Sequence, residues 1–230
     1  MEGTKAHPLP ERVRAVIFDM DGLLIDTEKY LVPCWCQAAR ELGYPMERRH
    51  ALHIRSLSEK FAAPYLQSEL GADFDYFKVR ERRKQLVAEK IEKEGLQPKK
   101  GAAQLLRWLQ EMGVPTAVAT ATDPVRAEGY LRQVGLYPYI GRLLSATMVE
   151  NGKPMPDVYL YACKELGEAP GDCVALEDSP NGILSAWRAG CAAVMVPDLT
   201  PPDEALHEIL SGEAESLADV IELLDGRVGR

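Results

Sequence analysis

The sequence predicts an α/β protein built on a doubly wound parallel sheet, with a helical segment inserted near its beginning. Three observations predict this fold. Short, almost continuous apolar runs alternate with amphipathic helical patterns, each run ends in polar or small residues, and residues 27–95 show helical patterns only. Apolar runs without polar alternation are typical of strands whose two faces are both covered by helices.

Five apolar runs have the length of strands. They cover residues 14–18, 115–120, 142–146, 173–177 and 192–196. Helical patterns separate the later runs, at residues 102–112, 124–134, 156–166 and 181–189. Strands that alternate with helices pair in parallel through right-handed crossovers, so these elements predict a Rossmann-like sheet.

Residues 27–95 contain no convincing strand and interrupt this alternation. Their last part, residues 76–94, is a long charged amphipathic helix whose charges we interpret as a solvated face. Gly95 is its expected C-cap, and Pro98 prevents the helix from continuing. An insertion after the first strand lies over the carboxyl ends of the strands, where α/β sheets bind ligands, and is a candidate lid. The expected division is an α/β core of residues 13–26 and 96–226, a helical cap domain of residues 27–95, and a mobile tail of residues 1–12.

Composition limits the class of protein. The 35 acidic residues outnumber the 27 basic ones and give a formal net charge of -8, which argues against a nucleic-acid partner. The first residues lack the apolar core of a signal peptide, and no apolar run is long enough to span a membrane. Five cysteines, an odd number, favour a reducing compartment. We therefore expect a cytoplasmic protein without membrane contacts, and a monomer, since no long apolar stripe demands a partner.

Two acidic pairs follow strands of the predicted sheet. Asp19 and Asp21 end the first strand, and Glu177 and Asp178 end the fourth. Carboxylates two residues apart on an extended chain point to the same side and can share a cation, although acids also form loops and helix N-caps. On the first pair alone both interpretations stay open. Because the second pair lies at the same edge of the sheet, together they favour a site for a hard cation such as Mg²⁺.

Three further residues suit a phosphate group. Thr120 and Ala121 follow the second strand just before a helix, where a hydroxyl and exposed amides can bind an anion. Lys153 precedes the helix at residues 156–166 and is the obvious cation among the loops. Each feature alone is weak evidence, since lone Lys or Thr residues at strand ends are usually structural.

Taken together and in this order, these residues resemble the motifs of the haloacid dehalogenase superfamily. The first motif is similar to FDMDGLLIDTE, the second is matched by Thr120, the third by Lys153 in GKPMPD, and the fourth by Glu177 and Asp178 in EDSPNG. The helical insert is similar to the small α-helical cap of subclass I. That group contains phosphatases of small metabolites and β-phosphoglucomutase.

The resemblance implies a mechanism. Asp19 is the implied nucleophile, which forms an aspartyl-phosphate, and Asp21 the implied general acid and base. Lys153, the Thr120 hydroxyl and the Ala121 amide hold the phosphoryl oxygens. The implied Mg²⁺ ligands are Asp19, the backbone carbonyl of Asp21, and Asp178, and Glu177 either binds the ion itself or supports the residues that do. The expected activity is Mg²⁺-dependent hydrolysis of a small phosphorylated metabolite, either a sugar phosphate or a nucleotide-like compound.

Two alternatives remain open at this point. A β-phosphoglucomutase-like phosphohexose mutase carries a His where this chain has Leu31, and a Lys and an Arg in the cap where it has His53 and Leu57. Trp35 does match an aromatic position of that subgroup, and Trp35, His53 and Arg55 are possible substrate contacts of the cap. The other alternative is a non-catalytic sugar-phosphate sensor, against which the intact set of acidic residues and Lys153 argues.

Overall fold

The computed structural model describes residues 5–229 and shows a parallel sheet of six strands in the order β3-β2-β1-β4-β5-β6. The strands are β1 (Ala15–Phe18), β2 (Thr116–Thr120), β3 (Arg142–Ser145), β4 (Cys173–Glu177), β5 (Ala192–Met195) and β6 (Gly212–Glu213). The predicted doubly wound α/β fold is therefore confirmed, and β1 to β5 correspond to the five predicted runs. Strand β6 was missed because two residues, one of them charged, form no apolar run.

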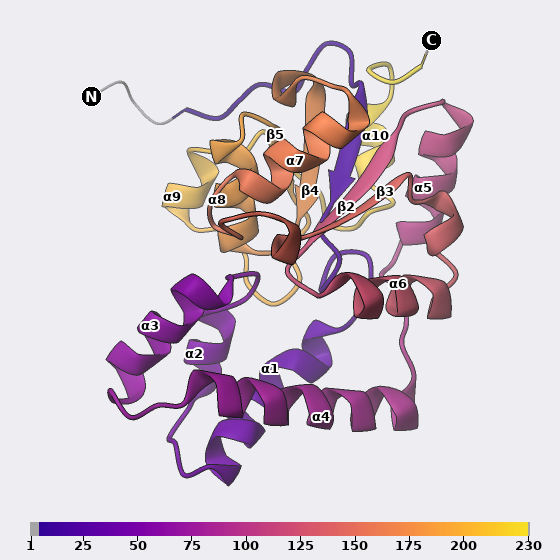
Figure 1. The fold of residues 1–230 in the computed structure, drawn as a ribbon. Helices are drawn as coiled ribbons and strands as arrows, with labels where there is room; N and C mark the ends of the chain where they lie inside the picture. The colour runs from indigo at the N-terminus through magenta and orange to yellow at the C-terminus, as the bar shows by residue number, and fades with distance from the viewer. Residues whose placement is uncertain (1–4, 230) are drawn as a thin grey trace.

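The two faces of the sheet carry side chains of different size. Val16, Phe18 and Leu176 belong to one buried cluster, whereas Ala15 and Ala175 belong to the other. Helices α5 (Ala102–Glu111) and α10 (Val220–Leu224) cover the first face, and α7 (Asp157–Leu166) and α8 (Pro180–Arg188) cover the second (Figure 1). Protein interiors are close-packed. Small alanine side chains on this face therefore favour a close approach of α7 and α8 to the sheet.

Strand β1 lies in the middle of the sheet, between β2 and β4. The strand order reverses at this point, so the carboxyl ends of β1, β2 and β4 adjoin one another. Open α/β sheets bind their ligands in the crevice at such a reversal. The fold therefore brings the predicted motifs to one place.

Four helices follow β1 and lie together beneath the carboxyl ends of the strands (Figure 1). They are α1 (Glu28–Glu41), α2 (Arg48–His53), α3 (Glu59–Leu70) and α4 (Tyr76–Glu94). The two connections between these helices and the sheet run side by side, since the amide of Asp26 donates to the carbonyl of Gln97 and that of Lys99 to the carbonyl of Leu24. The division into core and cap stays a prediction.

The described part of the N-terminal segment contacts α8. The indole nitrogen of Trp187 donates to the carbonyl of Lys5 at 3.0 Å, and the ring nitrogen Nε2 of His7 lies 2.9 Å from the carbonyl of Trp187. Residues 1–4 of the predicted mobile tail lie outside the described residues. Mobility of the remainder stays a prediction.

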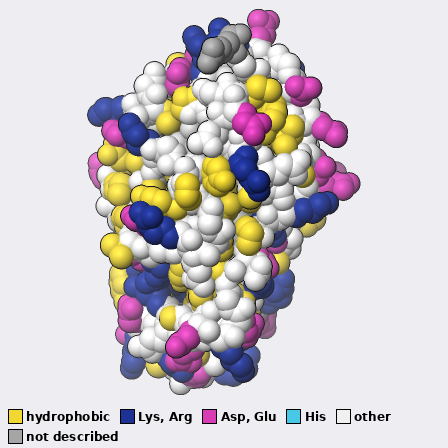
Figure 2. Space-filling view, turned by 90° about the vertical axis from the view of Figure 1, so that its right-hand side faces the viewer, with side chains coloured by type: hydrophobic (Ala, Val, Ile, Leu, Met, Phe, Trp, Pro, Cys, Tyr) yellow, Lys and Arg dark blue, Asp and Glu magenta, His cyan; other side chains and the backbone are white. Residues whose placement is uncertain are grey.

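Charged side chains of both signs crowd the lower end of the face shown in Figure 2, which the helices α1 to α4 form. Many of them pair with one another, as Arg82 does with Glu41 at 2.6 Å. Within residues 5–229, no helix combines the length and the apolar character that crossing a membrane requires. The cytoplasmic location and the monomeric state stay predictions.

Candidate active site

Lys153 connects two of the predicted motifs. Its ammonium lies 2.5 Å from Asp19 Oδ1 and 2.6 Å from Glu177 Oε1, and all three side chains are buried. Burial alone would lower the pKa of Lys153, but the negative charges of Asp19 and Glu177 outweigh burial and raise it. The side chain therefore stays charged and holds two carboxylates that would otherwise repel each other.

Glu177 is fixed from a second side by Tyr159. The phenol of Tyr159, on α7, donates a hydrogen bond of 2.5 Å to Glu177 Oε1, the same oxygen that Lys153 contacts. The carboxylate also packs against the first turn of α8, where a β-carbon on Gly182 would collide with it. Glycine is therefore required at position 182 for steric reasons, independent of its backbone angles.

Gly182→Ala should displace the carboxylate of Glu177 and loosen its contact with Lys153. Inserting one methyl group into a packed site costs about 1–3 kcal/mol of stability, and activity should fall with it. The measurements are Tm and kcat/KM. Gly171→Ala is the matched control, because a β-carbon there meets no atom within 4 Å. Equal Tm and equal kcat/KM for the two variants would contradict the packing argument.

Asp21 points into a different hydrogen-bond environment from Asp19. Thr27 Oγ1 donates to its Oδ1 and Thr122 Oγ1 to its Oδ2, both at 2.7 Å, while Thr120 Oγ1 lies 3.4 Å from Oδ2. Burial, followed by the charge of Asp19, raises the pKa of Asp21. A carboxyl group that is held in place and kept protonated more readily than usual suits a general acid.

The carboxylates of Asp19, Glu177 and Asp178 form a cluster that can hold a metal ion. One oxygen of each lies within 4.8 Å of the others. Asp19 Oδ2 and Asp178 Oδ1 are buried and have no hydrogen-bond partner among the described residues. Burial also raises the pKa of Asp178 well above its usual value, although the charge of Arg55 opposes this rise. Unpartnered carboxylate oxygens are the donors that a hard divalent cation requires, so this donor set fits such an ion.

Arg55, which follows α2, reaches this cluster from the helical insert. Its guanidinium forms an ion pair with Asp178 Oδ2, and its Nε lies 3.7 Å from Glu28 Oε1. It also donates to the Asp178 carbonyl at 3.2 Å and to Thr200 Oγ1 at 3.1 Å. The side chain is buried. The predicted substrate contact Arg55 is thus engaged with the protein's own carboxylates.

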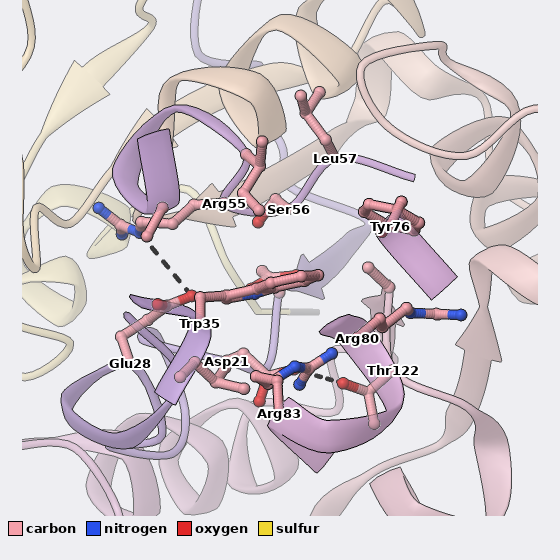
Figure 3. A pocket seen from close by; sticks show the side chains of 15 residues that line it. Asp21, Glu28, Trp35, Arg55, Ser56, Leu57, Tyr76, Arg80, Arg83 and Thr122 are labelled. Carbon is pink, nitrogen blue, oxygen red and sulfur yellow. Dashed lines mark hydrogen bonds and ion pairs between the residues drawn. The ribbon is translucent and has the colours of Figure 1, made fainter. Parts of the chain in front are cut away.

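A small cavity lies between Asp19 and Asp21 of the core and the helical insert (Figure 3). Its volume is about 100 Å³, well below the roughly 300–1,000 Å³ typical of small-molecule pockets. The core contributes Asp19, Asp21, Ala121 and Thr122 to its lining, and the insert contributes, among others, Trp35, Arg55, Tyr76, Arg80 and Arg83. In this arrangement it has space for little more than a phosphoryl group.

The cap residues named from the sequence fall into two groups. Trp35 lines the cavity, with its ring 5.6 Å from that of Tyr76. His53 does not line it, and its ring instead stacks on Tyr65 with centroids 3.8 Å apart. Helix geometry alone could not separate the two, because the path of α2 relative to the sheet is set by tertiary packing.

Sequence reasoning missed several residues of the site. Arg80 and Arg83 line the cavity although they lie in the charged run of α4, which the sequence predicts to be a solvated face. The prediction is wrong for Arg83, whereas Arg80 also keeps 29% of its side chain exposed. Tyr159 was also missed, since one tyrosine in a helix carries no sequence signal for a buried hydrogen bond to Glu177. The spacing of Arg80 and Arg83, three residues apart, was the available signal that they share a helix face.

Comparisons with known proteins identify the family of this chain. Residues 13–190 match haloacid dehalogenase-like hydrolases. The chain is 33% identical to hexitol phosphatase A of Escherichia coli over 86% of this chain and 92% of that protein. It is 28% identical to β-phosphoglucomutase of Bacillus subtilis, over 80% and 83% of the two chains. The structure of a β-phosphoglucomutase from Clostridium difficile, 20% identical, superimposes with a TM-score of 0.78 over 94% of this chain and 96% of that chain. The resemblance predicted from the four motifs is confirmed, and the chain belongs to the haloacid dehalogenase-like hydrolases.

Proposed function

We propose that this hydrolase releases phosphate from a small phosphorylated carbohydrate, using Mg²⁺ and a phosphorylated form of Asp19. The observation that carries the proposal is the state of Asp19: Lys153 holds one carboxylate oxygen, and the other is buried without a partner. Family membership supports a phosphoric monoester hydrolase. The similarity to a hexitol phosphatase supports a carbohydrate substrate.

The first proposed step transfers the phosphoryl group to the protein. A carboxylate oxygen of Asp19 forms a bond to phosphorus while the bond from phosphorus to the leaving oxygen breaks. Asp21, held by the hydroxyls of Thr27 and Thr122, donates its proton to that leaving oxygen. The result is an acyl phosphate on Asp19 and a free alcohol.

The second proposed step restores the carboxylate. Asp21, now deprotonated, takes a proton from a water molecule, whose oxygen attacks phosphorus and displaces Asp19. In both steps Lys153, the Thr120 hydroxyl and the Ala121 amide hold the phosphoryl oxygens. The hydroxyl of Thr120 is placed near this point, 3.4 Å from Asp21 Oδ2.

Asp19, Asp178 and the backbone carbonyl of Asp21 are the proposed Mg²⁺ ligands. Glu177 supports them from its contact with Lys153. When bound, the ion offsets the repulsion between a phosphate dianion and the carboxylates. This role agrees with the two unpartnered oxygens of Asp19 and Asp178.

Two other activities remain candidates for the experiment to exclude. The similarity to β-phosphoglucomutase keeps a mutase in consideration. Against it, Leu31 lines the cavity where that subgroup has a histidine, and no histidine lines the cavity within residues 5–229. A non-catalytic sensor would bind phosphorylated sugars without turnover.

The test is phosphate release from a panel of hexitol phosphates, hexose phosphates and nucleotides, each with Mg²⁺ and with chelator. We expect release from at least one sugar or sugar-alcohol phosphate in Mg²⁺ and none in chelator. Interconversion of hexose phosphates without net release would indicate the mutase instead. Binding of the same compounds without any conversion would indicate the sensor.

Arg55→Met should make the stability of the protein depend more strongly on Mg²⁺. Without Arg55, the buried carboxylates of Asp178 and Glu28 lose their cation, and breaking such a pair costs about 3–5 kcal/mol. Bound Mg²⁺ should replace part of this compensation, so the rise in Tm between chelator and Mg²⁺ should exceed that of the wild type.

The matched control for Arg55→Met is Arg49→Met. Arg49 lies on α2, and its ion pairs with Glu47 and Glu69 are at the surface, with 63% of its side chain exposed. Exposed pairs contribute about 0–1 kcal/mol. The same Mg²⁺-induced change in Tm for wild type, Arg49→Met and Arg55→Met would show that Arg55 does not compensate the metal carboxylates.

A further inference from the structure

Two arginines of α4, one turn apart, face the cavity from the side opposite the sheet. Arg80 and Arg83 line it together with Trp35, and Arg83 lies beside Asp21 and Thr122 (Figure 3). Arg82, between them, instead forms a surface ion pair with Glu41. One charged run therefore serves two faces of the helix.

Arg83 is a cation without a protein partner. Among residues 5–229, none of the ion pairs or side-chain hydrogen bonds includes it, and its Nε is buried and unpartnered. Its guanidinium lies 5.0 Å from the centroid of the Trp35 ring, a weak substitute for a carboxylate. Burial, together with the charges of Arg80 and Arg126, lowers the pKa of Arg83. Arg83 is partly buried and its nearest carboxyl group is Asp21, which forms no ion pair with it among the described residues, so the guanidinium is available to an anion from outside the protein.

Arg80 lies where the small cavity meets a larger one. A groove of about 760 Å³ runs between the helical insert and the loop before Lys153, and Arg80, Leu57 and Ala121 line both spaces. Arg80 pairs with Glu59 at 2.9 Å, but 51% of the Glu59 side chain is exposed, so this pair is weak and can exchange. A molecule with its phosphoryl group at Asp19 can therefore extend past Arg80 into the groove.

The transferring phosphoryl group does not account for these arginines. Lys153, at Asp19, is placed to hold that group, and Mg²⁺ on the carboxylate cluster would offset its charge, whereas Arg83 is beside Asp21, the proposed acid at the leaving oxygen. The leaving part of the substrate, which is attached to that oxygen, would therefore lie closer to Arg83 than the phosphoryl group does. We propose that Arg83, assisted by Arg80, binds a second anionic group on the leaving part of the substrate, a carboxylate or a second phosphate. This inference rests on the proposed hydrolysis and names the substrate class more closely.

The test uses two pairs of compounds that differ in the second anionic group. 6-Phosphogluconate is compared with glucose 6-phosphate for a carboxylate, and fructose 1,6-bisphosphate with fructose 6-phosphate for a phosphate. The quantity measured is kcat/KM for the compound with the second anionic group, divided by kcat/KM for the compound without it. Arg83→Met should lower this ratio by about 10- to 100-fold for at least one pair, the size of a lost charge-assisted hydrogen bond. Arg80→Met should lower it less, and the control Arg82→Met should leave it unchanged.

Equal losses of kcat/KM for both members of both pairs would overturn the proposal, because Arg83 would then act on the shared step through Asp21. Arg83→Met should also raise Tm without ligand, since it removes a partly buried charge that forms no ion pair among the described residues, and a lower Tm would contradict this. If the wild type releases phosphate from no compound, the proposed hydrolysis fails. The subsite is then judged by Tm in the presence of the same compounds. The anion-bearing member must stabilise the wild type more than Arg83→Met, and equal stabilisation overturns the inference.

Discussion

Asp19→Asn should lower kcat/KM by at least about 10⁴-fold for every compound that the wild type hydrolyses. Loss of a covalent nucleophile is among the largest single effects in enzyme kinetics, and reaches about 10⁶-fold in serine proteases. An amide is a far weaker nucleophile than a carboxylate, and Asn also removes the charge that Lys153 contacts at 2.5 Å. The measurement is steady-state phosphate release in Mg²⁺.

Two controls make this result specific to position 19. Asp172→Asn removes an exposed carboxylate at the far end of β4 and should leave kcat/KM unchanged. The Tm of Asp19→Asn should stay close to that of the wild type or rise, because one of several clustered buried carboxylates is neutralised. Activity within tenfold of the wild type would exclude Asp19 as the nucleophile.

Lys153→Met should impair both stability and catalysis. The ammonium is fully buried between Asp19 and Glu177, and its removal leaves two buried carboxylates without a cation. Breaking a buried pair in this way costs about 3–5 kcal/mol. Loss of one preorganised donor to the phosphoryl oxygens should lower kcat by about 10²- to 10³-fold in addition.

The two effects of Lys153→Met can be separated. Lys164→Met, on the exposed side of α7, is the matched control and should change neither Tm nor kcat. Activity is measured well below the Tm of each variant, so that unfolding does not contribute. A variant that keeps its fold and its full kcat would show that Lys153 is structural only.

The core motifs could be predicted from the sequence because the fold rules determine their positions. Parallel strands end at one edge of the sheet, so residues that follow β1, β2 and β4 must adjoin, and the apolar runs identify those strands directly. The contact of Lys153 with Asp19 agrees with that reasoning. The roles of these residues in catalysis stay predictions.

The helical insert could be predicted only in outline. No rule fixes how its helices pack, as the sheet edge fixes the positions of the core motifs. Periodicity therefore shows that α4 is a helix but not which of its charged side chains point inward. Arg83 and Arg82 are neighbours of one type, yet one lines the cavity and the other binds Glu41 at the surface. Likewise the ion pair between Arg55 and Asp178 joins residues 123 positions apart, and no local pattern encodes such a contact.

The central claim is that the phosphoryl group passes through Asp19, and stereochemistry at phosphorus tests it most directly. A substrate whose phosphate is made chiral with oxygen isotopes is hydrolysed in labelled water, and the configuration of the released phosphate is determined. Two successive in-line displacements, first by Asp19 and then by water, predict net retention of configuration. Net inversion would show that water attacks the substrate directly and would contradict the account.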